Sequence, residues 1–272
     1  MTQIKLICEP AIYWHGDETL LHDTIVQAAA AQVDFFKVQV FDTNSLGTAW
    51  KHKKGFYKTC EIGENRLKQC KNDCDELGLG LIATVNHAHS VELLVNQNVS
   101  NVKIASGQIH PLLIDAIKQH KWERIFVSTG MLENTNDLML IHQLAECTSE
   151  LVIMHCVSLY PTHDAELNLN RIKVLKGFFV NEIDKVAMGY SDHHMDDLPC
   201  LVAAGLGAEY IEKHFKLPDS FGPTSEIARL PEEMANLSGL CKRMGRMFGD
   251  GSLPMQPRER ESFEKYKNRW MI

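Results

Sequence analysis

The amino-acid sequence predicts a (β/α)8 barrel (TIM barrel), an α/β fold, built as a single domain. The chain has 272 residues, and about 250 residues are typical of one such barrel. Short apolar runs rich in β-branched residues recur along it eight times, separated by segments whose apolar residues are three and four positions apart. No glycine-rich dinucleotide-binding fingerprint follows the first run, where CEPAIYWHGD stands instead. This disfavours a doubly wound open sheet.

The eight apolar runs are expected as parallel strands, because each is almost continuously apolar, as strands covered on both faces are. They occupy residues 4–10, 34–40, 78–85, 101–107, 124–130, 151–157, 185–191 and 209–215. Between them, three- and four-residue spacing predicts helices that include 18–32, 63–78, 110–121 and 136–148. We place the barrel at residues 1–250 and expect the polar segment 251–272 to form a helical tail packed on the barrel.

Composition narrows the class of protein. A hydrophobic content of 44% is typical of a soluble globular protein with a large core, and a net charge of -7 argues against nucleic acid or an anionic membrane surface as partner. No apolar stretch is long enough to span a bilayer, and the opening MTQIKLICEP does not resemble a signal peptide. Cys70 and Cys74 lie four apart, but no second pair completes a zinc site. We therefore expect a cytoplasmic protein with reduced cysteines.

Polar side chains recur where the predicted strands end, and in this fold the chemistry collects at the carboxyl ends of the strands. These residues are Glu9, Lys37, Gln39, Thr84, Lys103, Ser106, Ser128, Ser158, Tyr160, Ser191, His193 and His214. Singly, a Ser or Thr at such a place usually caps a helix, and a Lys usually extends to water. Lys37 and Lys103 differ because each lies inside an apolar run, where a buried ammonium needs an anion. Two such lysines with several hydroxyls predict a phosphate site, or a phosphate-plus-carboxylate site.

Six sequence blocks then carry a resemblance. They are KIASGQ (103–108), STGM (128–131), HCVSLYPT (155–162), GYSDHH (189–194), AAGLGAEYIEKHF (203–215) and GP (222–223). In order and spacing, from about residue 5 to 250, the chain resembles the sialic acid synthase (N-acetylneuraminate synthase) family. The resemblance implies a barrel enzyme that condenses phosphoenolpyruvate with an aldose, N-acetylmannosamine or a modified relative, to form a nonulosonic acid and phosphate.

The resemblance also implies roles for individual residues. The phosphoenolpyruvate pocket would comprise Lys37, Gln39, Thr84, Lys103, Ser106, Ser128, Ser158 and Ser191. Glu9 would lie near the acceptor aldehyde and Tyr160 would line the sugar site, so that Glu9, Lys37, Lys103 and Tyr160 form the catalytic group. A divalent metal, Mn²⁺ or Mg²⁺, would be held by His193 and His214, which end neighbouring strands, and would polarise the aldehyde. His194 falls where the family usually has Thr and is left outside the site.

The chain also departs from the family pattern. Tyr13 and Trp14 stand where the family typically has Asn-His, and Thr224 replaces an acidic residue after Gly-Pro. Both places belong to the acceptor side, so we expect an acceptor other than plain N-acetylmannosamine. Most family members also have a small antifreeze-like C-terminal domain, which reaches across a homodimer to the sugar site of the partner. In this chain we expect the barrel domain without that C-terminal domain.

Two other classes of function stay open. One is a metal-dependent aldolase or lyase that uses the histidine pair without phosphoenolpyruvate, although such an enzyme would not need the two strand lysines and the hydroxyls. The other is a non-catalytic barrel that binds a sugar or a nucleotide-sugar enzyme, which the departures at Tyr13, Trp14 and Thr224 would suit.

Overall fold

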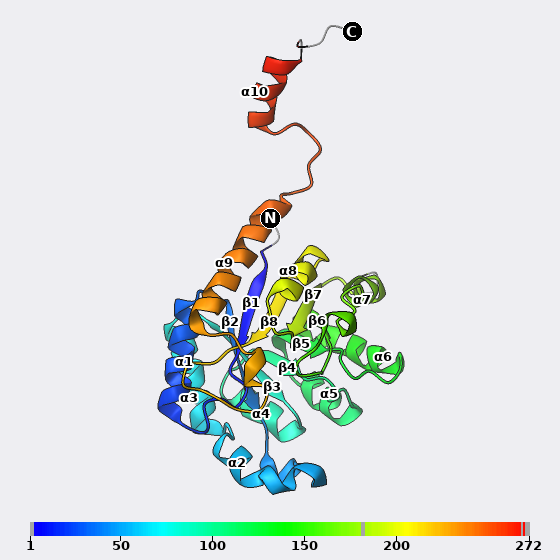
Figure 1. Cartoon of the computed structure of the whole chain (residues 1–272). Helices are drawn as coiled ribbons and strands as arrows, with labels where there is room; N and C mark the ends of the chain where they lie inside the picture. The colour runs from blue at the N-terminus through cyan, green and yellow to red at the C-terminus, as the bar shows by residue number, and fades with distance from the viewer. Residues whose placement is uncertain (1–2, 181–182, 268, 270–272) are drawn as a thin grey trace.

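The predicted barrel is confirmed by a computed structural model, which describes residues 3–180, 183–267 and 269. Its strands pair in parallel in sequence order, and the last closes onto the first (Figure 1). The strands are β1 (Lys5–Glu9), β2 (Phe35–Val40), β3 (Gly80–Val85), β4 (Asn101–Ile104), β5 (Trp122–Ser128), β6 (Thr148–Cys156), β7 (Val186–Asp192) and β8 (Tyr210–His214). Each overlaps one of the eight predicted runs, although β5 and β6 begin before theirs.

Helices follow the strands around the outside of the barrel, except for the last one, which lies in the C-terminal tail (Figure 1). They are α1 (Glu18–Ala30), α2 (Lys54–Thr59), α3 (Glu64–Glu76), α4 (Ala88–Asn96), α5 (Pro111–Lys118), α6 (Asn136–His142), α7 (Arg171–Phe179), α8 (Leu198–Gly205), α9 (Pro231–Phe248) and α10 (Pro257–Tyr266). Short 3-10 segments are η1 (Thr43–Ser45), η2 (Thr48–Lys53), η3 (Gln143–Cys147), η4 (Asp164–Glu166) and η5 (Ser225–Ile227). A capping residue fixes the beginning of α1, where the Asp17 side chain accepts hydrogen bonds from the backbone amides of Thr19 and Leu20.

The two faces of each strand bury against different partners. The outward side chains pack under the helices, where Cys70 and Cys74 of α3 join the main core. The inward side chains form a separate apolar layer, made of Ile7, Phe35, Ile82, Phe126, Val152, Met154, Ala187 and Tyr210. Glycine at position 80 makes room for this layer, because a Cβ there would lie 2.3 Å from the Phe35 ring. The layer fills the barrel and forms a floor beneath the carboxyl ends of the strands.

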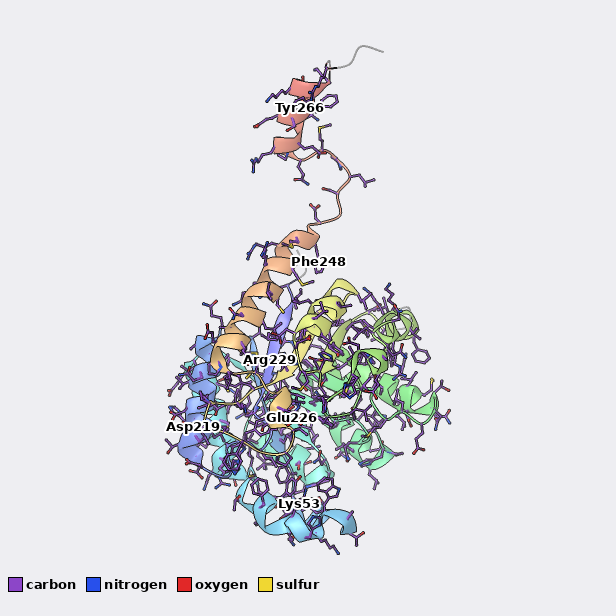
Figure 2. The ribbon with its side chains drawn as sticks, viewed as in Figure 1. Lys53, Asp219, Glu226, Arg229, Phe248 and Tyr266 are labelled. Atoms are coloured by element: carbon purple, nitrogen blue, oxygen red, sulfur yellow. The ribbon has the colours of Figure 1, made fainter. Side chains whose placement is uncertain are left out.

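The C-terminal segment forms the expected helix but not the expected packing. Every residue from Arg246 to Lys267 is exposed, and α10 extends away from the barrel beyond α9 (Figure 1). Figure 2 shows Phe248 at the end of α9 and Tyr266 farther out along the tail. The reason is composition, since Phe263 and Tyr266 are the only aromatic residues among the charged side chains of PRERESFEKY, too little apolar surface to dock a helix. Within the described residues, each helix is too short or too polar for a membrane span.

Candidate active site

A cavity of about 260 Å³ opens at the carboxyl ends of the strands, above the apolar floor. All the side chains that the sequence analysis placed in the site line this one cavity: Glu9, Lys37, Gln39, Thr84, Lys103, Ser106, Ser128, Ser158, Tyr160, Ser191, His193 and His214. Six further residues line it that the sequence analysis did not name: Asn86, Ala105, Gln108, Met131, Cys156 and Glu212. The structure therefore brings the predicted group together; the role of each member stays a prediction.

The most consequential of the unpredicted residues is Glu212, which binds both strand lysines. Its Oε1 and Oε2 lie 2.6 and 2.7 Å from Lys103 Nζ, and Oε1 lies 2.9 Å from Lys37 Nζ. Burial alone would raise the pKa of this carboxyl, but the two ammonium groups outweigh burial and hold the pKa of Glu212 well below its usual range. The anion that the buried lysines require is thus supplied, in the free protein, by the chain itself.

Glu9 completes this charged cluster. Its Oε2 lies 3.0 Å from Lys37 Nζ, and its Oε1 accepts a hydrogen bond of 2.6 Å from Gln39 Nε2. Burial opposes ionisation of Glu9, yet Lys37 overcomes it and lowers the pKa of the carboxyl. Two carboxylates therefore balance two ammonium groups, all of them at most 4% exposed. Gln39 acts here as a support for Glu9.

Hydroxyl groups line the same cavity next to the charged cluster. The Oγ1 of Thr84 and the Oγ of Ser128 are buried and have no hydrogen-bond partner within the described residues. Thr84 is the register partner of Lys103 on the neighbouring strand. Buried hydroxyls without partners are uncommon in folded proteins, and a ligand that binds beside them can supply the missing hydrogen bonds. These two orphaned groups fit an anion held beside Lys103.

The two histidines lie next to each other in the lining of the cavity, with ring centroids 5.5 Å apart. His193 Nδ1 donates to the carbonyl of Val157 over 2.8 Å, and His214 Nδ1 lies 3.3 Å from the hydroxyl of Tyr13. Each Nδ1 thus has a partner, and the Nε2 atoms face other groups of the cavity: His214 Nε2 lies 3.6 Å from Glu9 Oε2, and His193 is hydrogen-bonded to Cys156. Burial, which Glu9 only partly offsets, lowers the pKa of His214 to about 4, so this ring is neutral at pH 7.

These features suit a cation, because metal-binding histidines usually have the second nitrogen held by a carbonyl or another polar group. Among the residues that the structure describes, no three His, Cys, Asp or Glu side chains come together as a metal-binding group. A cation at His193 and His214 would therefore need water or substrate oxygens as its other ligands.

Cys156 contacts the predicted phosphate side of the site. Its Sγ lies 3.4 Å from Ser106 Oγ and 3.6 Å from Ser158 Oγ. Burial opposes ionisation of this thiol, but hydrogen bonding to His193 and to the two serines outweighs burial and lowers the pKa of Cys156 to about 7. Burial opposes protonation of His193, but its hydrogen bond to Cys156 contributes to a raised pKa of this ring. Gly130 packs between the same two serines, since a Cβ there would lie 2.6 Å from Ser106 Oγ and 2.8 Å from Ser158 Oγ.

The residues that depart from the family pattern do not line the cavity. Trp14 is 2% exposed and belongs to the core beneath the helices, and Tyr13 is 1% exposed. The Tyr13 hydroxyl donates to the carbonyl of Thr224 over 3.2 Å and lies 3.3 Å from His214 Nδ1. Tyr13 and Thr224, which both depart from the family pattern, thus contact each other next to His214. The buried rings of Tyr13 and Trp14 offer no face to an acceptor sugar. Tyr160 does, because it is 44% exposed with its ring centroid 4.1 Å from that of His193.

His194 points away from the cavity, as the sequence analysis expected of a residue outside the site. Its Nε2 lies 3.0 Å from Asp164 Oδ1 and its Nδ1 lies 3.3 Å from Asp196 Oδ1. Adjacent residues on an extended segment project to opposite sides, which separates it from His193.

The sequence did carry a signal for Glu212. It is a charged residue inside an apolar run, as Lys37 and Lys103 are, and it precedes His214 by two positions. Residues two apart on a strand share a face, so the placement of His214 in the site implies the same for Glu212. Asn86 and Gln108 lie after strands β3 and β4, where periodicity no longer fixes a direction.

Comparison with known proteins agrees with this geometry. The model of the NeuB family matches residues 24–252. N,N'-diacetyllegionaminic acid synthase of Campylobacter jejuni is 28% identical over 271 residues, covering 92% of this chain and 79% of the relative. N-acetylneuraminate-9-phosphate synthase of Drosophila melanogaster is 32% identical over 216 residues, covering 78% of this chain and 55% of the relative.

A solved structure shows the same architecture. The N-acetylneuraminic acid (sialic acid) synthetase of Leptospira borgpetersenii, crystallised in complex with citrate, superposes with a TM-score of 0.87 at 26% identity. The match covers 97% of this chain and 92% of that one. The similarity therefore extends over the whole barrel.

Proposed function

The chain belongs to the NeuB family, and on this premise we propose that it condenses phosphoenolpyruvate with an aldose to form a nonulosonic, sialic-acid-like acid, with release of phosphate. The observation that carries the proposal is the single cavity that contains Lys37, Lys103 and the partnerless hydroxyls of Thr84 and Ser128. Ammonium groups and hydroxyls converging on one point are what a phosphate and a carboxylate require. The relatives named above are synthases of nonulosonic acids, in agreement with this chemistry.

In the proposed reaction, Lys37 and Lys103 bind the carboxylate and phosphate of phosphoenolpyruvate, with hydroxyls of Thr84, Ser128 and Ser191 as further donors. The enol carbon C3 attacks the aldehyde carbon of the open-chain sugar, which leaves C2 cationic. Water adds to C2, and phosphate departs by cleavage of its bond to C2, taking the remaining proton of that water as C2 becomes a ketone. Glu9 would carry a proton from that water to the former aldehyde oxygen, because its carboxylate is ionised and its Oε2 lies 3.6 Å from His214 Nε2.

Glu212 has a separate task in this scheme. It holds Lys37 and Lys103 side by side before the substrate binds. The cluster is neutral in the free protein, so the substrate meets ammonium groups that are already placed and need little reorganisation.

His193 and His214 would hold a divalent cation, Mn²⁺ or Mg²⁺. When bound, the cation would supply a Lewis acid that polarises the acceptor aldehyde. Tyr160 is placed to contact the acceptor, because its ring lies over His193 at the exposed rim. From the family resemblance alone, we propose that the protein acts in the cytoplasm as a homodimer.

For the acceptor we propose only a chemical class, which is an N-acetylated or diacetamido aldose, either free or phosphorylated. The products for which the relatives are named differ in these substituents. Because Tyr13 and Trp14 are buried, selectivity among these sugars would depend on Tyr160 and Met131, which line the cavity and are exposed.

The test is to incubate the full chain with phosphoenolpyruvate, Mn²⁺ and a panel of such aldoses. Inorganic phosphate and the mass of a new nonulosonic acid are measured together, with Lys103→Met as the inactive control. We expect equimolar phosphate and acid with at least one aldose. Cleavage of a nonulosonic acid without any use of phosphoenolpyruvate would point to an aldolase, and binding of sugar without turnover to a non-catalytic barrel.

A further inference from the structure

A buried ion pair lies directly behind the two histidines of the site. Asp192 ends β7 and is the register partner of Lys213 on β8. Side chains alternate along a strand, so His193 and His214, which follow these two residues, face the cavity while Asp192 and Lys213 face the helices. Both charged side chains are completely buried, and Lys213 Nζ lies 2.5 Å from Asp192 Oδ2.

The ammonium of Lys213 uses all three of its hydrogens on one short segment. Besides Asp192, its acceptors are the backbone carbonyls of His194 at 2.6 Å and Asp196 at 3.1 Å. A fully buried ammonium is stable only with a complete set of acceptors. Removing this side chain would leave two carbonyls of the β7–α8 segment without their partner.

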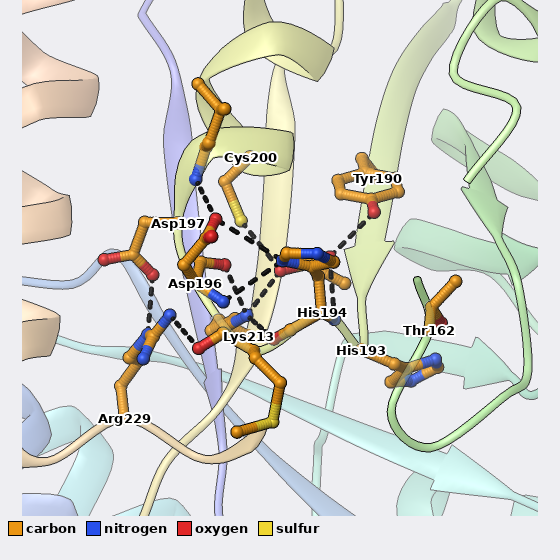
Figure 3. A network of polar contacts seen from close by, with 12 residues as sticks. Thr162, Tyr190, His193, His194, Asp196, Asp197, Cys200, Lys213 and Arg229 are labelled. Carbon is orange, nitrogen blue, oxygen red and sulfur yellow. Dashed lines mark hydrogen bonds and ion pairs between the residues drawn. The ribbon is translucent and has the colours of Figure 1, made fainter. Parts of the chain in front are cut away.

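Asp192 is equally well saturated. Its Oδ1 accepts from the Tyr190 hydroxyl at 2.7 Å and from the backbone amide of His194 at 3.2 Å. Its Oδ2 accepts from Cys200 Sγ at 3.4 Å as well as from Lys213. The pair therefore binds both the amide and the carbonyl of His194, the residue that follows His193 (Figure 3).

The rest of the segment is held in the same way. Four consecutive carbonyls, those of residues 193–196, each have a partner outside the segment: Thr162 N at 3.0 Å, Lys213 Nζ, Arg229 Nη2 at 2.7 Å and again Lys213 Nζ. Arg229 Nε also contacts Asp197 Oδ1 at 2.7 Å. Figure 3 shows these contacts converging on the segment from β8 and from the chain before α9. Such a number of external bonds on one loop fixes its backbone, and with it the place of His193.

We propose that the Asp192–Lys213 pair is a positioning device that sets the spacing and orientation of His193 and His214 for the cation. The inference rests on the proposed function, because that function assigns the cation to the two histidines. One end of the pair is covalently next to His193 and the other is next to His214. A shift of either charged side chain is therefore transmitted to the imidazole beside it.

Stabilisation of the fold alone does not explain why this position has an ion pair. A buried ion pair is generally no more stabilising than apolar residues of similar volume, so stability alone does not call for charges here. Holding a loop by its carbonyls does call for a donor, and Lys213 provides three hydrogens where an apolar side chain provides none.

The experiment compares wild type with Lys213→Met and with the double variant Asp192→Asn/Lys213→Met. The double variant leaves no unpaired buried charge, so it keeps the test possible if the single variant does not fold. Three quantities are measured: hydrogen exchange of residues 193–197 in the metal-free protein, the Kd for Mn²⁺, and the shift in Tm caused by phosphoenolpyruvate. We expect faster exchange of that segment and a Kd for Mn²⁺ raised about tenfold or more, with the phosphoenolpyruvate shift retained.

Arg124→Met is the matched control. Arg124 contacts Glu150 Oε2 at 2.9 Å and the Tyr210 hydroxyl at 3.1 Å. Tyr210 is on β8, as Lys213 is, but it begins the strand and lies toward the end of the barrel opposite the histidines. This variant should lower Tm without changing the Kd for Mn²⁺. Wild-type Mn²⁺ affinity in the folded Lys213 variants would overturn the inference. Absence of Mn²⁺ binding in wild type would overturn the cation site of the proposed function, and the inference with it.

Discussion

Lys103 Nζ lies within 2.7 Å of both carboxylate oxygens of Glu212, in the lining of the cavity at the barrel mouth. The two residues are 109 positions apart in the sequence and come from β4 and β8. Lys37 reaches the same carboxylate from β2. The two lysines of the predicted anion pocket are thus already paired with a carboxylate of the chain itself.

From this arrangement we expect phosphoenolpyruvate to raise the Tm of the wild type. A ligand at about ten times its Kd adds about 1.4 kcal/mol to the free energy of unfolding, or about 3–6 °C for a domain of this size. Lys103→Met should abolish the shift and also lower the starting Tm, because Glu212 loses one of its two ammonium partners. Differential scanning fluorimetry measures both. Lys118→Met, on the exposed side of α5, is the control that should keep the full shift; a full shift in Lys103→Met would rule out the pocket.

The second prediction separates the three histidines of the site region. His193→Ala and His214→Ala should each lose bound Mn²⁺, because two protein ligands leave little redundancy. His194→Ala should retain it, since this ring contacts Asp164 and Asp196 outside the cavity. Elemental analysis after equilibrium dialysis gives the metal content of each variant. Equal content in wild type and His193→Ala would remove the cation site.

The third prediction tests the hydroxyls of the phosphate side by steric means. In Gly130→Ala the new methyl group would lie under 3.0 Å from the hydroxyls of Ser106 and Ser158, so both hydroxyls must rotate. We expect the Kd for phosphoenolpyruvate to rise about tenfold, the equivalent of about one charge-assisted hydrogen bond, while Tm changes little. Isothermal titration measures the Kd. Gly239→Ala serves as control because a Cβ at that glycine meets no atom within 4 Å; equal affinity in both variants would exclude these serines from the pocket.

The fourth prediction concerns pH and a buried histidine outside the cavity. His155 Nε2 donates to the Leu167 carbonyl at 2.7 Å, and its Nδ1 is buried without a partner within the described residues. Burial lowers the pKa of His155 below its ordinary value of about 6.5. The unfolded chain therefore takes up a proton below about pH 6.5 that the folded protein does not, and stability is lost as the pH falls from there toward the folded pKa.

In His155→Gln this contribution is missing. The difference in unfolding free energy between wild type and variant should shrink as the pH falls from 7.5 to 5.5, by at most about 1.4 kcal/mol per pH unit. Urea unfolding at several pH values measures it. A difference that is independent of pH would show that His155 is protonated equally in the folded and unfolded states.

Much of this site could be predicted because two regularities of the barrel fold are visible in short stretches of the sequence. Parallel strands covered on both faces are continuous apolar runs, and their carboxyl ends carry the chemistry of a barrel. Lys37 and Lys103 were recognisable as charges inside such runs, and the structure places both in the cavity with the other predicted side chains. Glu212 could have been predicted as well, because it precedes His214 by two positions and therefore shares its face of the strand.

The sequence by itself therefore determined the strands, the face taken by polar residues within those strands, and the family. Tertiary structure alone decided which charges pair: Glu212 with lysines 175 and 109 positions away, and Asp192 with Lys213 behind the histidines. It also decided that Tyr13 and Trp14 are buried. The physical reason is that periodicity reports the direction of a side chain relative to its own strand. The partner in that direction is set only when the barrel closes and brings distant strands within a few ångströms.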